Sequence, residues 1–188
     1  MSQENRLRKL TPEELGRLSV EDYRAAPKFP MRLLLDNLRS RYNVGSLLRS
    51  ADAFRVEKVY LAGFTPAPPH PEIHRSALGA EESVEWEKVY ESKSIIEALK
   101  GSGWTVISLE HTNRSVKIWQ FRWPPAPWLI ILGNELTGVS DTLLHLSDEV
   151  VEIPQFGTKH SLNVAIAGGI VLYEAAKHLM AEGFSHNG

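Results

Sequence analysis

The sequence predicts an α/β fold with a mostly parallel sheet and helices on both faces. The first observation is a strand–helix–strand unit over residues 31–63, because strands joined through a helix pair in parallel with a right-handed crossover. The second is that residues 128–146 and 149–173 each read as an apolar strand, a glycine loop and a helix. In open α/β sheets, ligands bind beyond the carboxyl ends of the strands. We therefore expect the functional site at the two C-terminal loops.

Length and composition are typical of a single globular domain. The 188 residues are enough to bury a core. No apolar run approaches the roughly 18 residues of a membrane helix, and the polar N-terminus is not a secretory signal. The chain has no cysteine, which excludes disulfides and thiolate metal sites and fits a cytoplasmic protein. We expect neither a membrane nor a metal as a partner.

The charge is unevenly distributed along the chain. A net charge of −2 argues against a generic nucleic-acid binder. Residues 1–60, however, carry 12 Lys and Arg against 8 Asp and Glu, whereas the remainder carries 9 against 15. A basic N-terminal third can attract a phosphate backbone to one face of the molecule.

The chain divides into an N-terminal helical extension, residues 1–30, and a main domain, residues 31–188. Within the extension, Thr11–Glu14 and Ser19–Asp22 each have the pattern of a helix start. The main domain opens with the buried strand Met31–Leu35.

A helix and a strand complete the first unit. Tyr42–Phe54 places its apolar residues at helical spacing, and Asn43 stands where an N-cap is expected. Val56–Gly63 is the next predicted strand. Ser92–Gly101 then predicts a helix and Trp104–Leu109 a strand.

Two stretches between these elements contain residues that could have either a functional or a purely structural role. His70 and His74 are four residues apart, but the prolines beside them argue against a helix, so we discount a metal site. Trp119–Trp123 interleaves aromatic side chains with a cation, as a base-stacking surface does. It leads into two prolines and a strand, so ordinary packing is the favoured interpretation and base stacking the alternative.

The first C-terminal unit begins with the apolar strand Trp128–Leu132. The loop Gly133–Ser140 follows, and Ser140 or Asp141 is expected to cap a short helix that ends at Leu146.

The second unit begins with the strand Glu149–Ile153 and a proline–glycine loop. Ser161 suits the N-cap of the last helix. Residues 162–173 are apolar or small on every face, which predicts a buried helix. Gly168 and Gly169 cost roughly 1 kcal/mol each against alanine in a helix, which the close approach of a neighbouring backbone or a ligand would justify.

The two loops suit an adenosine-type ligand without a polyphosphate. Both are rich in glycine and backbone donors. Neither G-x-G-x-x-G after the first strand nor G-x-x-x-x-G-K-[ST] is present, and a nucleotide-dependent α/β enzyme is excluded for want of such a phosphate loop.

Three segments together resemble the SpoU/TrmH-type RNA 2′-O-ribose methyltransferases of the SPOUT superfamily: Asn43–Phe54, Leu132–Ser140 and Ile153–Glu174. The stretch His74–Ala80 is similar to the segment that links the family's motifs. The resemblance covers about residues 31–180. Leu136 departs from a glycine that is frequent at its position.

The resemblance implies S-adenosylmethionine as cofactor and RNA, either tRNA or rRNA, as substrate. It implies a SPOUT-type fold whose second and third segments form a C-terminal trefoil knot, and a homodimer whose active site is completed across the interface. The cofactor-binding positions carry over to Gly133, Ile153 and Leu162, with Glu110 as a fourth.

The catalytic positions of the family carry over to five residues: Asn43, Arg49, Glu135, Ser161 and Asn163. The two asparagines and the serine are suited to orient a ribose, and Glu135 to fix the loops or the partner's arginine. The family proposal makes the arginine a base, but a guanidinium remains protonated in proteins. We expect Arg49 to act as an electrostatic clamp on phosphate and developing alkoxide, with a surface ion pair as the alternative.

Two other functions are compatible with such a fold. One is a non-catalytic RNA-binding or assembly protein, against which the joint presence of the five catalytic positions argues. The other is a SPOUT enzyme that methylates a base nitrogen, whose loops are expected to differ from those found here.

Overall fold

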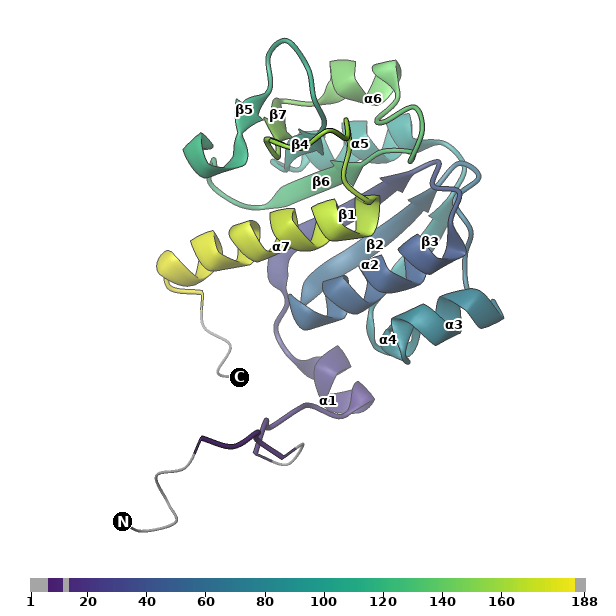
Figure 1. Ribbon diagram of the computed structural model, residues 1–188, viewed down its shortest axis with the longest axis vertical. Coiled ribbons are helices and arrows are strands. Elements are labelled where there is room, and N and C mark those ends of the chain that lie inside the picture. The colour runs from purple at the N-terminus through teal and green to yellow at the C-terminus, as the bar shows by residue number, and fades with distance from the viewer. Residues whose placement is uncertain (1–6, 12–13, 185–188) are drawn as a thin grey trace.

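The computed structural model describes residues 7–11 and 14–184. Seven strands form one parallel sheet in the order β3-β2-β1-β6-β4-β7-β5 (Figure 1). Their bounds are β1 Phe29–Asp36, β2 Val56–Ala62, β3 Trp86–Val89, β4 Thr105–Leu109, β5 Val116–Lys117, β6 Trp128–Leu132 and β7 Glu149–Glu152. The predicted parallel α/β sheet is confirmed, and the predicted strands agree with the observed ones within two residues at each end.

Helices cover both faces of the sheet, as predicted. One face carries α1 (Val20–Ala25), α2 (Arg41–Ala53), α3 (Pro71–Ala77), α4 (Ala80–Ser83) and α7 (Val164–Ala181). The other carries α5 (Ser92–Gly101) and α6 (Asp141–Leu146). Figure 1 shows α2 and α7 side by side across the first face. The knot that the resemblance implies stays a prediction.

The buried strands separate two apolar clusters. Along β1, Leu33 and Leu35 belong to the cluster beneath α2 and α7, whereas Leu34 belongs to the cluster beneath α5 and α6. Every residue of β6 is buried. This is the pattern of a central parallel strand with helices on both sides, for which near-continuous apolar sequence is expected.

The N-caps of α2 and α7 differ from the predicted ones. Ser40 caps α2, accepting a hydrogen bond from the Asn43 N–H at 3.3 Å, so Asn43 lies inside the helix. Asn163 caps α7, accepting from the N–H groups of Ala165 at 2.8 Å and Ile166 at 3.3 Å, and Ser161 precedes the helix. Serine and asparagine cap about equally well, so local preference does not distinguish between neighbouring candidates.

The last helix is not buried on every face, which corrects the sequence prediction. Val171, Leu172 and Leu179 are buried, but Ile166 and Tyr173 are 58% and 55% exposed. The helix has 18 residues and a mean hydropathy of 1.3, enough in length and composition to cross a membrane, yet one of its faces packs into the core of the domain. Ile166 and Tyr173 lie seven residues apart on one face of the helix, and the described residues leave this face largely exposed.

The two glycines of α7 meet different surroundings. A Cβ at Gly168 would lie 2.4 Å from a methyl of Leu47 and 2.7 Å from one of Leu132, so here the helix needs glycine to approach α2 and β6. At Gly169 the nearest atom is the Ser50 Oγ at 3.9 Å. The predicted close approach is therefore confirmed for Gly168 alone.

One predicted helix start in the N-terminal extension is confirmed, whereas the expectation that no helix forms beside the proline-rich loop is wrong. Ser19 caps α1 by accepting from the Asp22 N–H at 3.1 Å, as predicted. In the other predicted helix start, Pro12 and Glu13 lie outside the described residues. The segment after the proline-rich loop forms the helix α3, with Pro71 in its first turn. Proline is well tolerated there because its missing N–H would lack a helical partner anyway.

Candidate functional site

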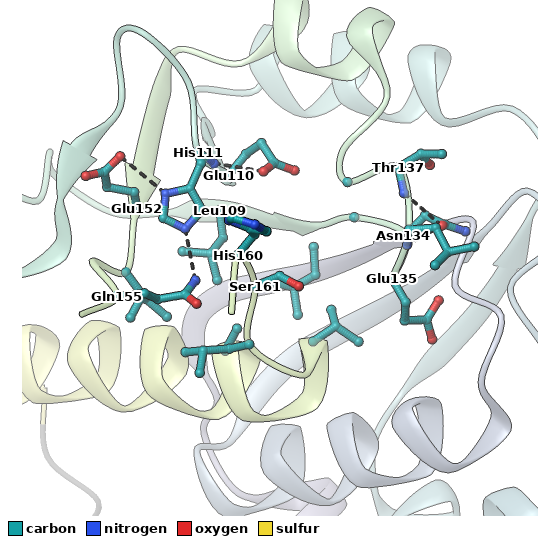
Figure 2. Close-up of a pocket in the computed structure, with 18 residues that line it drawn as sticks. Leu109, Glu110, His111, Asn134, Glu135, Thr137, Glu152, Gln155, His160 and Ser161 are labelled. Atoms are coloured by element: carbon teal, nitrogen blue, oxygen red, sulfur yellow. Dashed lines mark hydrogen bonds and ion pairs between the residues drawn. The ribbon is translucent and has the colours of Figure 1, made fainter. Parts of the chain in front are cut away.

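A pocket of about 380 Å³ lies where β4, β6 and β7 end, between the two C-terminal loops (Figure 2). This volume is within the usual range of ligand sites, about 300–1,000 Å³. Its position at the carboxyl ends of neighbouring strands is the predicted one. The lining residues are Leu109, Glu110, His111, Leu132, Gly133, Asn134, Glu135, Leu136, Thr137, Gly138, Glu152, Ile153, Gln155, His160, Ser161, Leu162, Val164 and Ala167.

The first loop, residues 133–140, is closed on itself. The backbones of Asn134 and Gly138 exchange two hydrogen bonds of 2.9 Å. The Asn134 Oδ1 accepts from the N–H groups of Leu136 at 2.8 Å and Thr137 at 3.2 Å. A Cβ at Gly133 would lie 2.1 Å from the Gly138 carbonyl carbon. Gly133 is thus required by the loop itself, before any ligand is considered.

Two carboxylates hold the first loop from either side. The Glu110 Oε2 accepts from the Val139 N–H at 2.9 Å, and the buried Asp36 accepts from the Ser140 N–H at 2.9 Å. The second Glu110 oxygen accepts from the His111 N–H at 2.8 Å. Glu110 therefore lines the pocket while both of its oxygens are engaged with backbone.

The other predicted cofactor positions come together in the pocket. Gly133 lies at the end of β6, Ile153 at the end of β7, and Leu162 just before α7. In the second loop, which contains Leu162, all residues from Phe156 to Asn163 are exposed.

A polar cluster in the pocket was missed by the sequence analysis. The His111 Nδ1 lies 3.5 Å from a Glu152 oxygen, and its Nε2 lies 3.2 Å from the Gln155 Nε2. Ser115 donates to the same Glu152 carboxylate at 2.6 Å. Figure 2 shows His111, Glu152 and Gln155 on one side of the pocket and Glu135 on the other. Sequence position could have indicated this cluster, because His111 lies two residues after the end of β4.

Three of the predicted catalytic residues form one hydrogen-bonded chain. The Asn163 Nδ2 donates to the Asn43 Oδ1 at 3.0 Å, and the Asn43 Nδ2 donates to the Glu135 Oε1 at 2.8 Å. Glu135 also accepts from the N–H groups of Arg39 at 2.9 Å and Ser40 at 3.0 Å. The chain joins α2, the first loop and the start of α7, which are the three segments of the family resemblance.

Opposing influences set the pKa of Glu135. Burial raises this pKa, but the hydrogen bonds from Arg39, Asn43 and Ser40 together outweigh it and hold the pKa below its ordinary value. Glu135 is therefore an ionised acceptor that ties the first loop to the start of α2.

The remaining two predicted catalytic residues lie apart from this chain. Ser161 lines the pocket from the second loop. Arg49 is exposed on α2, six residues after Asn43, about 9 Å along the axis and on a different side of the helix. Within the described residues its side chain forms no hydrogen bond or ion pair. Four of the five predicted catalytic residues therefore lie at the pocket or beside it, three in the hydrogen-bonded chain and Ser161 in the pocket lining, whereas Arg49 lies outside.

The charge of the pocket favours a cationic ligand. Three carboxylates line it, those of Glu110, Glu135 and Glu152, and no lysine or arginine of the described residues does. A polyphosphate would meet like charge here, whereas a ligand with a positive centre would be attracted.

Known proteins of one family are similar to this chain in sequence and in fold. Residues 30–173 match the SpoU rRNA Methylase family. The 23S rRNA (guanosine-2′-O-)-methyltransferase RlmB of Vibrio parahaemolyticus is 28% identical over 170 residues, 90% of this chain and 68% of that protein. The tRNA (guanosine(18)-2′-O)-methyltransferase of Aquifex aeolicus is 29% identical over 149 residues, 79% of this chain and 69% of that protein.

Solved structures agree with this assignment. The SpoU methyltransferase AviRb from Streptomyces viridochromogenes, in complex with the cofactor AdoMet, superposes with a TM-score of 0.73 at 28% identity, over 85% of this chain and 62% of that one. The A. aeolicus TrmH/SpoU tRNA-modifying enzyme superposes with a TM-score of 0.78 at 25% identity, over 87% of this chain and 84% of that one. The chain thus spans about two thirds of several relatives, and it belongs to the SpoU rRNA methylase family.

Proposed function

We propose that this protein transfers a methyl group from S-adenosylmethionine to a ribose 2′-hydroxyl of tRNA or rRNA. The observation that carries the proposal is the chain Asn163–Asn43–Glu135 at the edge of an acidic pocket. It places two amide side chains, fixed by an ionised carboxylate, beside a site suited to a cationic ligand. The named methyltransferase activities of the relatives support the same chemistry. We place this activity in the cytoplasm.

The residues of the pocket fit such a cofactor. When bound, S-adenosylmethionine supplies an electrophilic methyl group on a positively charged sulfonium. Gly133, Ile153 and Leu162 would hold it through backbone and apolar contacts. Glu110 acts as a positioning residue, because its carboxylate fixes the backbone of the first loop. The acidic lining attracts the positive charge.

The side chains around the pocket would position the methyl acceptor. Asn43, Asn163 and Ser161 orient the ribose, so that its 2′-hydroxyl faces the transferable methyl in line. Glu135 holds the Asn43 amide in one orientation. A protonated guanidinium, that of Arg49, would stabilise the phosphate and the negative charge that develops on the attacking oxygen.

The position of Arg49 supports a homodimer in which this residue serves the partner's pocket. The Ser50 Oγ faces α7, 3.9 Å from the Cβ position of Gly169, and Arg49 is the preceding residue of α2. Phe54 and Tyr173, 6.2 Å apart in an edge-to-face contact, continue this surface. A second copy that covers the exposed Ile166 and Tyr173 would bury apolar area and carry Arg49 across the two-fold axis.

Subunit complementation tests the catalytic role and the dimer together. Arg49→Ala should lower single-turnover methylation of RNA by about 10²–10³-fold, the usual effect of losing one preorganised donor. Arg49→Lys should rescue it partly, because it keeps the charge and loses the planar fork. A heterodimer of one Arg49→Ala and one Asn43→Ala subunit should recover about half the wild-type rate, because one of its two sites holds both native residues.

Each alternative has its own signature in these experiments. An inactive heterodimer would place Arg49 in the pocket of its own chain. Near-normal rates for Arg49→Ala would make it a surface residue, with stability effects below about 1 kcal/mol. A monomer mass by light scattering with full activity would refute the dimer. Wild-type protein that binds RNA but incorporates no methyl group would support the non-catalytic alternative.

A further inference from the structure

Two exposed aromatic side chains from distant parts of the chain meet at the rim of the pocket. Trp119 belongs to the short helix η2 (Ile118–Gln120), and Phe156 to the second loop. Their ring centroids are 6.4 Å apart and their planes differ by 12°, an offset stack. Trp119 is 58% exposed and Phe156 is 89% exposed. We call these two residues the aromatic pair.

The neighbours of Trp119 show what packing looks like in the same segment. The ring centroid of Trp123 lies 5.1 Å from that of Phe121, in a T-shaped contact, and 4.7 Å from that of the buried Trp128. The packing interpretation of this stretch is therefore confirmed for Phe121 and Trp123. No ring contact joins Trp119 to that cluster within the described residues, and it stacks on a residue that is itself almost fully exposed.

The aromatic pair is close to the chemistry. Phe156 follows Gln155, which lines the pocket, and the same loop continues to Ser161. η2 follows β5, whose Lys117 is paired with Glu152 of β7 at the edge of the sheet. Both rings therefore belong to segments that adjoin the pocket lining.

Three cations lie close in sequence to the two members of the aromatic pair. Lys117 and Arg122 flank η2, and Lys159 lies three residues after Phe156; all three are exposed. Within the part of the chain that the structure describes, none of them forms an ion pair. Aromatic faces beside free cations are the combination that binds single-stranded nucleic acid, by stacking on bases and by attraction to phosphates.

Resting on the proposed function, we propose that the aromatic pair is a stacking site for an unpaired nucleobase of the substrate RNA, next to the nucleotide whose ribose enters the pocket. The exposed face of Phe156 would receive the base, with Trp119 supporting the ring from behind. The three cations would hold the adjoining phosphates. The methylated nucleotide should therefore lie in a single-stranded loop of the RNA and not in a duplex, because only an unpaired neighbouring base can stack on Phe156.

Two labelled probes separate stacking from charge: a fluorescein-labelled adenosine decamer and an abasic ribose-phosphate decamer of equal length. Wild-type protein should bind the adenosine decamer more tightly in fluorescence anisotropy. Phe156→Ala and Trp119→Ala should weaken adenosine-decamer binding by about 5- to 150-fold, the range for one base on an aromatic ring. Neither should change the abasic decamer. Phe156→Tyr and Trp119→Phe should retain binding within about threefold.

Two controls complete the experiment. Tyr90→Ala removes an aromatic side chain that is 84% exposed just after β3, at the opposite edge of the sheet, and should leave both probes unaffected. Lys159→Gln should weaken both probes alike and reduce the slope of log affinity against log salt by about 0.7, the value for one charge on a single strand. Thermal melts confirm that each variant is folded.

Three results would overturn the inference. The first is unchanged adenosine-decamer binding by both alanine variants. The second is equal wild-type affinity for the two decamers. The third is a shift from dimer to monomer in the alanine variants by light scattering, which would make the pair a contact between copies of this chain. In each case methylation by the wild-type protein shows whether the proposed function stands independently of this inference.

Discussion

The two loops that enclose the pocket are similar in sequence pattern and differ in how they are held. Residues 133–140 close on themselves through Asn134 and Gly138 and are tied to Glu110 and Asp36. In the second loop, residues 156–162 are exposed and form no hydrogen bond with any described residue. Asn163, at its end, fastens it to Asn43 and to α7. The first loop is a fixed wall of the site, and the second is a segment anchored at its ends.

This difference indicates a division of labour between the loops. A ligand that needs a preformed cradle is best served by the loop whose backbone groups are already positioned. A macromolecule that must enter and leave is best met by an exposed segment, where the aromatic and cationic side chains of the pocket rim stand. Paired substitutions, one in each loop, test this difference.

We expect the largest difference between the two loops when a glycine of each, Gly133 or Gly157, is replaced by alanine. In Gly133→Ala the new Cβ would lie 2.1 Å from the backbone of Gly138 and Val139, so the loop must open. We expect a loss of about 3 kcal/mol or more in the free energy of unfolding and no measurable binding of S-adenosylmethionine by calorimetry. In Gly157→Ala nothing lies within 4 Å of the new Cβ. Its stability should change by less than about 1 kcal/mol. Similar losses in both variants would contradict the comparison.

Acid should loosen the first loop through Glu135. Its pKa in the folded protein is below the ordinary 4.5. The stabilisation is therefore fully present above that value and is lost as the pH falls through the folded pKa. Glu135→Gln places an amide against the N–H of Arg39 or Ser40, so we expect it to be less stable at pH 7 by about 1–3 kcal/mol.

Melting temperatures of wild type and Glu135→Gln, measured between pH 7 and pH 3, check this prediction. The gap between the two proteins should begin to narrow below about pH 4.5, where the Glu135 carboxyl of the unfolded chain takes up a proton. It should close as the pH falls through the lower pKa of the folded protein. Gln155→Glu, which adds a carboxyl to the second loop, controls for the general effect of charge. A gap that is independent of pH would show that Glu135 does not act through its charge.

The anchor of the second loop gives the smallest effect. Asn163→Ala removes the N-cap of α7 and should cost about 1 kcal/mol, the usual value for a cap. Ser161→Ala, two residues earlier, should change stability by less than about 0.5 kcal/mol, because its hydroxyl does not cap the helix. Chemical denaturation of both variants is sufficient. A larger loss of unfolding free energy in Ser161→Ala than in Asn163→Ala would indicate that Ser161 caps the helix, as the sequence pattern predicted.

Most of the fold could be predicted because its signals are local. Buried parallel strands such as Trp128–Leu132 are continuous apolar runs, and helices such as Ser92–Gly101 show their period directly. The position of the pocket followed from the rule on strand ends. The caps of α2 and α7 could not be predicted, because Ser40 and Asn43, like Ser161 and Asn163, are interchangeable by local preference. In α2 the side chain of Asn43 is engaged with Glu135 and Asn163 and Ser40 caps the helix, whereas in α7 Asn163 both caps the helix and donates to Asn43.

The parallel sheet, the pocket at the last two loops and the family could be inferred from the sequence, because each depends on contiguous residues. How these residues act together became visible only in the folded protein. It showed that Glu110 acts on the first loop, that Asn43 joins Asn163 to Glu135, and that Arg49 stands outside the pocket of its own chain. It also brought Trp119 onto Phe156. The physical reason is that hydrogen bonds and ring contacts between residues 29 to 120 positions apart depend on the packing of whole elements, which no local pattern encodes.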